Sequence, residues 1–203
     1  MGYTTDFEGR LEFDKPLTTE QREYINLLSS TRRMKRDVGK LMKLYKGEFG
    51  NPFALPRTPE TIYGHDGEYF AKDDGNSGQT EDESIIDYNC PPGQQKYDST
   101  ADFSARWEEN KRLTLEGKCQ PGLWCQWVID SDGYALQWDG NEKFYNYIEW
   151  LKYLINHFFE PWGVKLNGVI EWEGEDSNDK GKIIVNDNVV KIKKAIITYI
   201  DED

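Results

Sequence analysis

The segment from Asn141 to Trp162 constrains the fold more than any other part of the chain, because its apolar residues recur at helical spacing. This spacing places them on one side of an α-helix and predicts an amphipathic helix with one buried face. Pro161 ends the pattern, since proline cannot continue a helical hydrogen-bond ladder. The predicted buried stripe consists of Phe144, Tyr147, Ile148, Leu151, Leu154, Ile155, Phe158 and Trp162.

Segments whose apolar residues recur at every second position flank this helix and predict β-strands. The N-terminal stretch 3–13 alternates in this way, and so does LNGVIEWEG after Gly163. Between them, residues 123–129 and 134–138 also alternate, and the turn formers of 130–133 join them into a hairpin. Near the C-terminus KIIV, VVKI and AIITYI predict two or three closing strands.

The order of these elements predicts an α+β fold. A helix should follow the first strand, since Thr18 or Thr19 can cap a segment whose apolar stripe is Tyr24, Leu27 and Leu28. Without residues 47–118, the order is strand, helix, strand, strand, helix, strand and a closing hairpin or strand. We expect an antiparallel sheet with helices on one face, as a ferredoxin-like split βαβ sandwich with a large loop insertion.

The insertion is the region from about 47 to 118, within a single domain that spans residues 1–203. It holds most of the prolines and shows little periodicity, so we interpret it as irregular and partly mobile. A short helix is expected within it at about 101–112.

Composition excludes several functional classes. The 203 residues carry a net charge of −12, and the hydrophobic fraction of 37% is typical of a globular protein. The sequence has no run of about 18 apolar residues and no secretory signal pattern, so we expect a cytoplasmic protein without membrane contact. The negative charge disfavours non-specific DNA binding by the surface as a whole.

The stretch from Cys119 to Gly140 raises the question of a metal site, because it combines two cysteines with several aspartates. Structural zinc sites pair ligands roughly two to four residues apart, a spacing that Cys90, Cys119 and Cys125 lack. Cys125 lies within a predicted strand, where cysteine packs as a small hydrophobic residue. The acidic stretches 130–142 and 176–187 both depart from the EF-hand pattern. We therefore predict no metal and no cofactor, and interpret the stretch as a hairpin with an aromatic face.

No catalytic signature accompanies the predicted fold. The chain has no nucleophile elbow, no P-loop and no glycine-rich dinucleotide motif after a strand. His157 lies beside the apolar stripe of the long helix and is interpreted as a structural residue. We predict a protein that is not an enzyme, with an enzyme of unrecognised type as the third alternative.

One segment is basic in this acidic chain. Residues 32–46 are rich in lysine and arginine against a single acid, Asp37, and their apolar residues predict an amphipathic basic helix. A solvated helix face is the default interpretation, and contact with phosphate or an acidic partner is the alternative. The candidate contacts are Arg32, Arg33, Lys35, Arg36, Lys40 and Lys43, together with Trp124 and Trp138 as candidate exposed aromatic contacts.

Several longer motifs lie along the chain: GYTTDFEGRLEF, TRRMKRD, DESIIDYNCPPG, PGLWCQW, WDGNEKFYNYIEWLKYLINHFFEPWG and LNGVIEWEGEDSNDKGKIIVNDNVV. Together they resemble a family of uncharacterised proteins of bacteria and their phages. The resemblance covers both ends and the middle of the chain and spares mainly residues 38–80 and 93–118. Because the family has no assigned activity, it implies a phage or mobile-element setting and no mechanism.

Taken together, these observations predict a small, acidic, intracellular binding protein that acts by contact with a host or phage protein. A compact acidic protein without a catalytic signature can mask a basic surface, so inhibition of a host defence or regulatory factor is the most specific expectation. The alternative is a nucleic-acid- or nucleotide-binding module that uses the basic segment 32–46.

Overall fold

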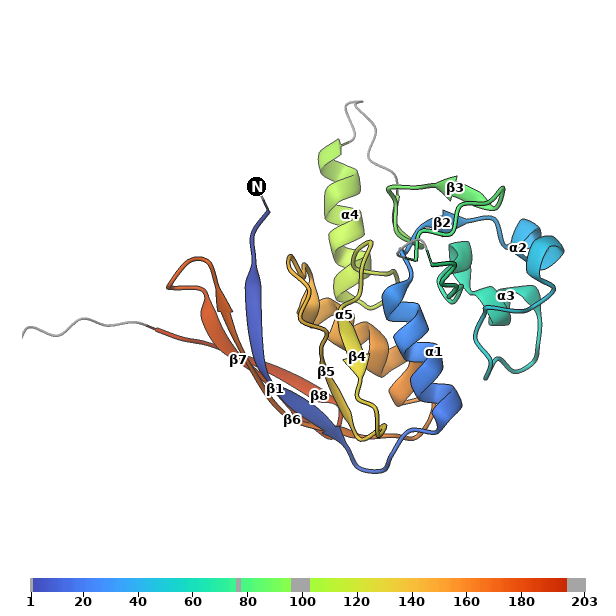
Figure 1. The fold of residues 1–203 in the computed structure, drawn as a ribbon. Coiled ribbons are helices and arrows are strands. Elements are labelled where there is room, and N and C mark those ends of the chain that lie inside the picture. The colour runs from blue at the N-terminus through green and yellow to red at the C-terminus, as the bar shows by residue number, and fades with distance from the viewer. Residues whose placement is uncertain (1, 76–77, 96–102, 197–203) are drawn as a thin grey trace, which may run out of the picture.

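A computed structural model describes residues 2–75, 78–95 and 103–196 (Figure 1). The main sheet has the strand order β4-β5-β1-β6-β7-β8, and every neighbouring pair is antiparallel. A second sheet pairs β2 (Lys35–Arg36) with β3 (Ile85–Asp87). The strands of the main sheet are β1 (Thr5–Phe13), β4 (Trp127–Ile129), β5 (Ala135–Trp138), β6 (Leu166–Gly174), β7 (Lys180–Asn186) and β8 (Val189–Lys194).

Helices α1 and α5 lie together on one side of the main sheet (Figure 1). The predicted α+β fold with an antiparallel sheet is therefore confirmed. The main sheet contains two strand–helix–strand units, β1-α1-β4 and β5-α5-β6. Strand β5 lies between the two strands of the first unit, and β1 lies between the two strands of the second. The ferredoxin-like assignment itself stays a prediction. The helices are α1 (Thr19–Ser30), α2 (Val38–Tyr45), α3 (Pro59–Tyr63), α4 (Phe103–Leu115) and α5 (Tyr147–Leu154), with a 3₁₀ turn η1 (His65–Gly67) and a π-helix η2 (Ile155–Phe159).

The local sequence explains where the two main helices begin. Thr18 caps α1 by accepting a hydrogen bond from the Gln21 amide, and the Gln21 side chain accepts one from the Thr18 amide in return. Helix α5 begins at Tyr147, later than the apolar spacing from Asn141 predicts, because Lys143 and Asn146 have positive φ angles of 65° and 55°.

The core lies between the sheet and helices α1 and α5. Leu151, Leu154 and Phe158 of the predicted stripe have no exposed surface, and they belong to one cluster with Leu11 and Trp127 of the sheet. Phe7 and Tyr147 are only partly buried, and their rings pack edge-to-face with centroids 4.8 Å apart. The predicted core is thus confirmed for these fully buried residues, whereas Tyr147, Ile148 and Trp162 of the predicted stripe are only partly buried. The expected final strand, AIITYI, falls mostly on residues 197–203, outside the described residues.

The insertion contains regular structure in its described part. Helices α3 and α4 and strand β3 lie within it, and α4 agrees with the helix expected at about 101–112. A second hydrophobic cluster joins Leu41 of α2 to Ala54, Ile62, Tyr63 and Phe70 of the insertion. Helix α3 has five residues and strand β3 has three, and elements this short leave little periodicity in a sequence. None of the described helices is long and apolar enough to cross a membrane.

Candidate functional site

The predicted basic helix over residues 32–46 is wrong in its first half. The chain is extended from Thr31 to Asp37, and residues 35–36 pair with β3 instead of forming a helical turn. Helix α2 starts only after Asp37, whose carboxylate accepts a hydrogen bond from the Lys40 amide at 2.8 Å. This cap fixes the start of the helix, because the aspartate satisfies an amide that has no partner within the helix.

Arg33 is part of the protein scaffold and not a contact for a partner. Its side chain is 1% exposed, and it donates hydrogen bonds to Gln120 Oε1 at 3.1 Å and to the Glu68 carbonyl at 2.8 Å. Burial lowers the pKa of the Arg33 guanidinium to about 10, so the group still carries its charge at neutral pH. The arginine thus uses its charge to join the insertion to the segment that precedes β4.

Arg36 is also buried, which corrects its assignment as a surface contact. Its Nη1 lies 2.8 Å from Asp82 Oδ2 and 2.9 Å from Ser84 Oγ, and its guanidinium stacks 4.6 Å from the centre of the Phe70 ring. A charged side chain can be buried in this way only when it is paired and hydrogen-bonded.

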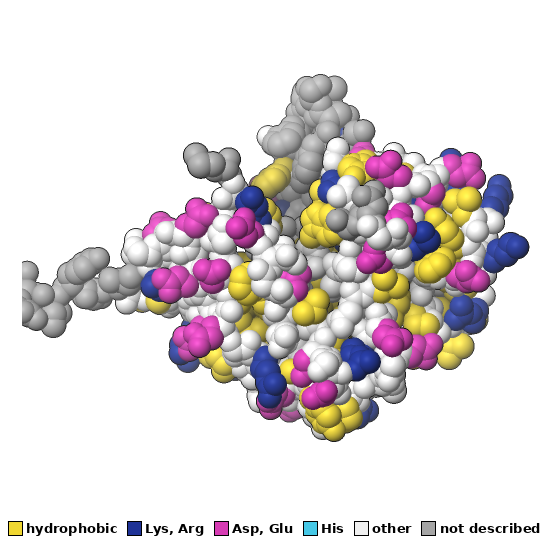
Figure 2. All heavy atoms as spheres, in the orientation of Figure 1, with side chains coloured by type: hydrophobic (Ala, Val, Ile, Leu, Met, Phe, Trp, Pro, Cys, Tyr) yellow, Lys and Arg dark blue, Asp and Glu magenta, His cyan; other side chains and the backbone are white. Residues whose placement is uncertain are grey.

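The other four basic candidates differ in their exposure. Arg32 is half-buried, 4.5 Å over the Tyr88 ring and 5.9 Å from the Trp124 ring. Lys35 is half-buried in an ion pair of 3.0 Å with Asp66. Lys40 and Lys43 are exposed on α2. Because Arg33 and Arg36 are buried and Arg32 is half-buried, the segment does not present a row of arginines for phosphate. Figure 2 shows acidic side chains beside basic ones on the face drawn.

A groove of about 880 Å³ lies beside the aromatic hairpin. The C-terminal half of α1, the segment 122–128 and the loop 139–146 form its walls. Leu123, Trp124, Val128 and Tyr145 contribute apolar surface to it. Concave sites that combine apolar lining with a few polar groups are the usual form of a binding site. The groove is therefore the candidate functional site.

The charged groups of the groove are mainly acidic. Asp73, Asp139 and Glu142 line it, whereas Lys143 is the one basic residue among the described residues of the lining, and Lys143 Nζ lies 3.8 Å from Glu142 Oε2. Asp139 holds the loop by accepting hydrogen bonds from the amide and side chain of Asn141, both at 2.8 Å. This arrangement favours a ligand that carries positive charge.

The two candidate tryptophans have different environments, and neither is fully exposed. Trp124 is half-buried and lines the groove, where the Arg32 guanidinium lies over it. Trp138 packs 5.4 Å from Phe7, and its Nε1 donates to Gln126 Oε1 at 3.2 Å. Trp138 is half-buried like Trp124, and its ring is held by Phe7 and by the side chain of Gln126.

The hydrogen bonds of His157 fit its interpretation as a structural residue. Its Nδ1 lies 3.0 Å from the Tyr69 hydroxyl, its Nε2 lies 2.9 Å from the Gly117 carbonyl, and its ring stacks on Tyr153 at 4.0 Å. Since a carbonyl only accepts, Nε2 carries the proton and Nδ1 accepts from tyrosine. Sequence reasoning missed Glu68 and Gln120, which complete this network at Tyr153, because no motif marks an isolated polar residue that becomes buried.

The cysteines are all buried thiols. Burial raises the pKa of Cys125 to about 12, which makes it a poor nucleophile at neutral pH. Within the described residues, no group of three or more histidine, cysteine or acidic side chains is arranged to hold a metal ion.

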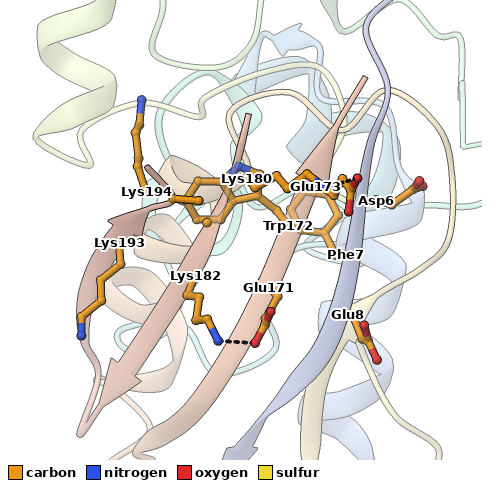
Figure 3. A pocket seen from close by; sticks show the side chains of 12 residues that line it. Asp6, Phe7, Glu8, Glu171, Trp172, Glu173, Lys180, Lys182, Lys193 and Lys194 are labelled. Atoms are coloured by element: carbon orange, nitrogen blue, oxygen red, sulfur yellow. Dashed lines mark hydrogen bonds and ion pairs between the residues drawn. The ribbon is translucent and has the colours of Figure 1, made fainter. Parts of the chain in front are cut away.

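A second hollow, of about 490 Å³, is lined by residues of β1, β6, β7 and β8 from both faces of the main sheet (Figure 3). Ion pairs of 2.5 Å join Lys180 to Glu173 and Lys182 to Glu171, from β7 to β6. The next strand, β1, places Asp6 and Glu8 opposite those glutamates. The solvent face of the sheet therefore changes from acidic at β1 to basic at β8.

Comparison of the chain with protein-family models, with curated proteins and with solved structures finds no match.

Proposed function

We propose that the protein acts by binding another protein in the groove beside the aromatic hairpin, and that it does so without catalysing a reaction. The observation that carries this proposal is the composition of the groove: among its described lining residues, Trp124 and Leu123 lie beside three carboxylates and one lysine, with the Arg32 guanidinium over the Trp124 ring. The expected occupant is a segment of the partner that presents lysine or arginine next to an apolar side chain.

Two physical effects support this assignment. An acidic surface on a protein of net charge −12 attracts a basic partner at long range and accelerates encounter. Tryptophan contributes disproportionately to binding energy when a partner covers it, because its large ring loses contact with water. Arg32 over the Trp124 ring restricts the orientation of the indole, which reduces the entropy lost on binding.

Within this proposal, the resemblance to proteins of bacteria and their phages makes a host regulatory or defence factor the expected partner. The nucleic-acid alternative loses its main support, since Arg33 and Arg36 are buried and Arg32 and Lys35 have partners within the protein.

Capture of partners from host lysate tests the proposal. The wild-type protein should capture a basic protein from the lysate. The variants Trp124→Ala and Glu142→Lys should each capture much less of that protein. Glu20→Lys is the matched control, because it makes the same change in charge at an exposed position of α1, remote in sequence from the loop. Equal loss in Glu142→Lys and Glu20→Lys would show that only the overall charge matters, and the groove would then not be the site.

A further inference from the structure

The two edges of the main sheet differ in how they are protected. At the β4 edge, Asn26 of α1 donates to the Ile129 carbonyl at 3.0 Å and accepts from the Ile129 amide at 2.7 Å. Ser29, one turn later, donates to the Trp127 carbonyl at 2.6 Å. Side chains of α1 thus take the place of a neighbouring strand along β4. Strand β8 forms the other edge of the sheet.

The hydrogen bonds of β8 show which of its backbone groups point away from the sheet. The amide of Ala195 donates to the Lys180 carbonyl at 2.8 Å, and Val189 pairs with Asn186 across the turn. In an antiparallel pair, alternate residues bond to the neighbouring strand. Residues 189, 191 and 193 therefore bond to β7, whereas the amides and carbonyls of Val190, Ile192 and Lys194 point outward. In the part of the chain that the structure describes, β7 is the only strand beside β8.

The side chains of β8 give this edge two chemically different faces. Lys191 and Lys193 project on the solvent face, and neither forms an ion pair within the described residues. Val190, Ile192 and Lys194 project on the opposite face, where Ile192 is 36% exposed because no helix covers it. Figure 3 shows Lys193 and Lys194 pointing to opposite sides of the strand.

We propose that β8 accepts an added strand from a partner protein, and that this strand alternates acidic and apolar residues. The outward amides and carbonyls of Val190, Ile192 and Lys194 would supply the backbone hydrogen bonds, as in other cases of β-strand addition. Carboxylates on the added strand lie opposite Lys191 and Lys193, and its apolar side chains extend the face formed by Val190 and Ile192.

A second copy of this chain fits the edge less well. Two β8 strands that pair antiparallel with their faces aligned place Lys191 opposite Lys193 or opposite Lys191 of the other copy. Like charges directly opposite each other destabilise a sheet, and lysine on an edge strand is a common protection against self-association. The charge of the edge therefore favours an acidic partner. This site lies on a different strand from the groove and needs the opposite charge in its ligand.

A short synthetic peptide of alternating glutamate and valine is the probe for this edge. Adding the glutamate–valine peptide to the protein should slow hydrogen exchange at the amides of Val190, Ile192 and Lys194. Adding a lysine–valine peptide should leave the exchange at these amides unchanged. The double variant Lys191→Glu/Lys193→Glu should no longer bind the glutamate–valine peptide and should bind the lysine–valine peptide instead.

Two variants at one position separate the backbone contact from the side chain. Ile192→Pro removes both the side chain and the outward N–H, whereas Ile192→Ala removes the side chain alone and is the matched control. The Ile192→Pro variant should bind the peptide about tenfold more weakly than the Ile192→Ala variant, because it loses one backbone hydrogen bond to the peptide.

Three outcomes would overturn the proposal. In the first, the two variants bind the peptide equally well. In the second, the slowed amides lie away from β8, for example in the groove. In the third, the outward amides are already protected without peptide, which would mean that a second copy or the chain itself occupies the edge.

Discussion

The Arg36 guanidinium lies 2.8 Å from the Asp82 carboxylate, and this ion pair joins the extended segment before α2 to the segment before β3. The Arg36 side chain is 1% exposed and that of Asp82 is 13% exposed. Tyr45 donates a second hydrogen bond to the same carboxylate oxygen, at 2.8 Å. The carboxylate therefore connects α2, β2 and the insertion through one charged group.

Asp82→Asn should destabilise the protein by about 3 kcal/mol, because it leaves the buried Arg36 charge without a counter-charge. Urea denaturation at neutral pH measures the change in the free energy of unfolding. Glu83→Gln is the matched control, since its side chain is exposed and its loss of charge should change stability by less than about 0.5 kcal/mol. Similar values for the two variants would show that the ion pair contributes nothing.

The effect of Asp82→Asn should depend on pH. Burial alone raises the pKa of Asp82, but hydrogen bonds from Ser84 and Tyr45 and the charge of Arg36 outweigh it, so the pKa lies below its ordinary value. A carboxylate with a lowered pKa stabilises the fold above its ordinary pKa, and this contribution is lost as the pH falls through the folded value. The difference between wild type and variant should therefore shrink below about pH 4. A difference that grew on acidification would contradict the assignment.

Leu151→Ala should cost about 2–5 kcal/mol of stability, because Leu151 is fully buried between α5 and the sheet and its truncation leaves a cavity. Glu160→Ala, at an exposed position after η2, is the control and should change stability by less than about 0.5 kcal/mol. Equilibrium denaturation of both variants distinguishes them. If Leu151→Ala behaved like the control, α5 would not pack on the sheet as described.

The protein should not retain single- or double-stranded nucleic acid on a filter at physiological salt. Lys40→Glu/Lys43→Glu is the informative variant, because both lysines are exposed, whereas glutamate at Arg33 or Arg36 would unfold the protein and confuse the result. The variant should behave like wild type at low and at high salt. Retention by the wild type that declines with salt and disappears in the variant would instead support the nucleic-acid alternative.

Asn26→Ala should expose the β4 edge. The substitution removes both hydrogen bonds to Ile129, so we expect a loss of about 2 kcal/mol and concentration-dependent association through the unprotected strand. Urea denaturation and analytical ultracentrifugation measure the two effects. Glu23→Ala, at an exposed position on the same helix, should show neither. A variant that associates no more than wild type and is equally stable would indicate that α1 does not protect the edge.

Periodicity in the sequence was sufficient to predict the main sheet and its two helices. Burial of one face of a strand or helix requires apolar residues at a fixed spacing, and Leu11 and Leu151 are among them. It was insufficient for the basic segment. Lysine and arginine residues at helical spacing give the same sequence pattern whether their side chains are solvated or buried. Burial depends on whether the fold supplies a hydrogen-bond or ion-pair partner. Asp82 and Gln120 are those partners, and both lie far along the chain from Arg36 and Arg33.

The same limit applies to the groove. Trp124 and Trp138 are equivalent as sequence features, and both belong to the aromatic hairpin. Both are half-buried, but their surroundings differ: Gln126 and Phe7 contact Trp138, whereas Trp124 lines the groove. Contacts of this kind depend on tertiary structure that local patterns do not encode.

The central position of β1 determines when the protein can complete its folding during synthesis. This strand is made first, yet Leu11 pairs with Leu136 of β5 and Phe7 with Trp172 of β6, so both of its neighbours come from the second half of the chain. At the usual speed of ribosomes, roughly 6–25 s separate the emergence of β1 from that of its first partner. During this interval Phe7, Leu11 and Phe13 have no sheet to pack against. The nascent chain is consequently vulnerable to aggregation and proteolysis at β1, and this vulnerability ends only when β5 and β6 have been made and pair with it.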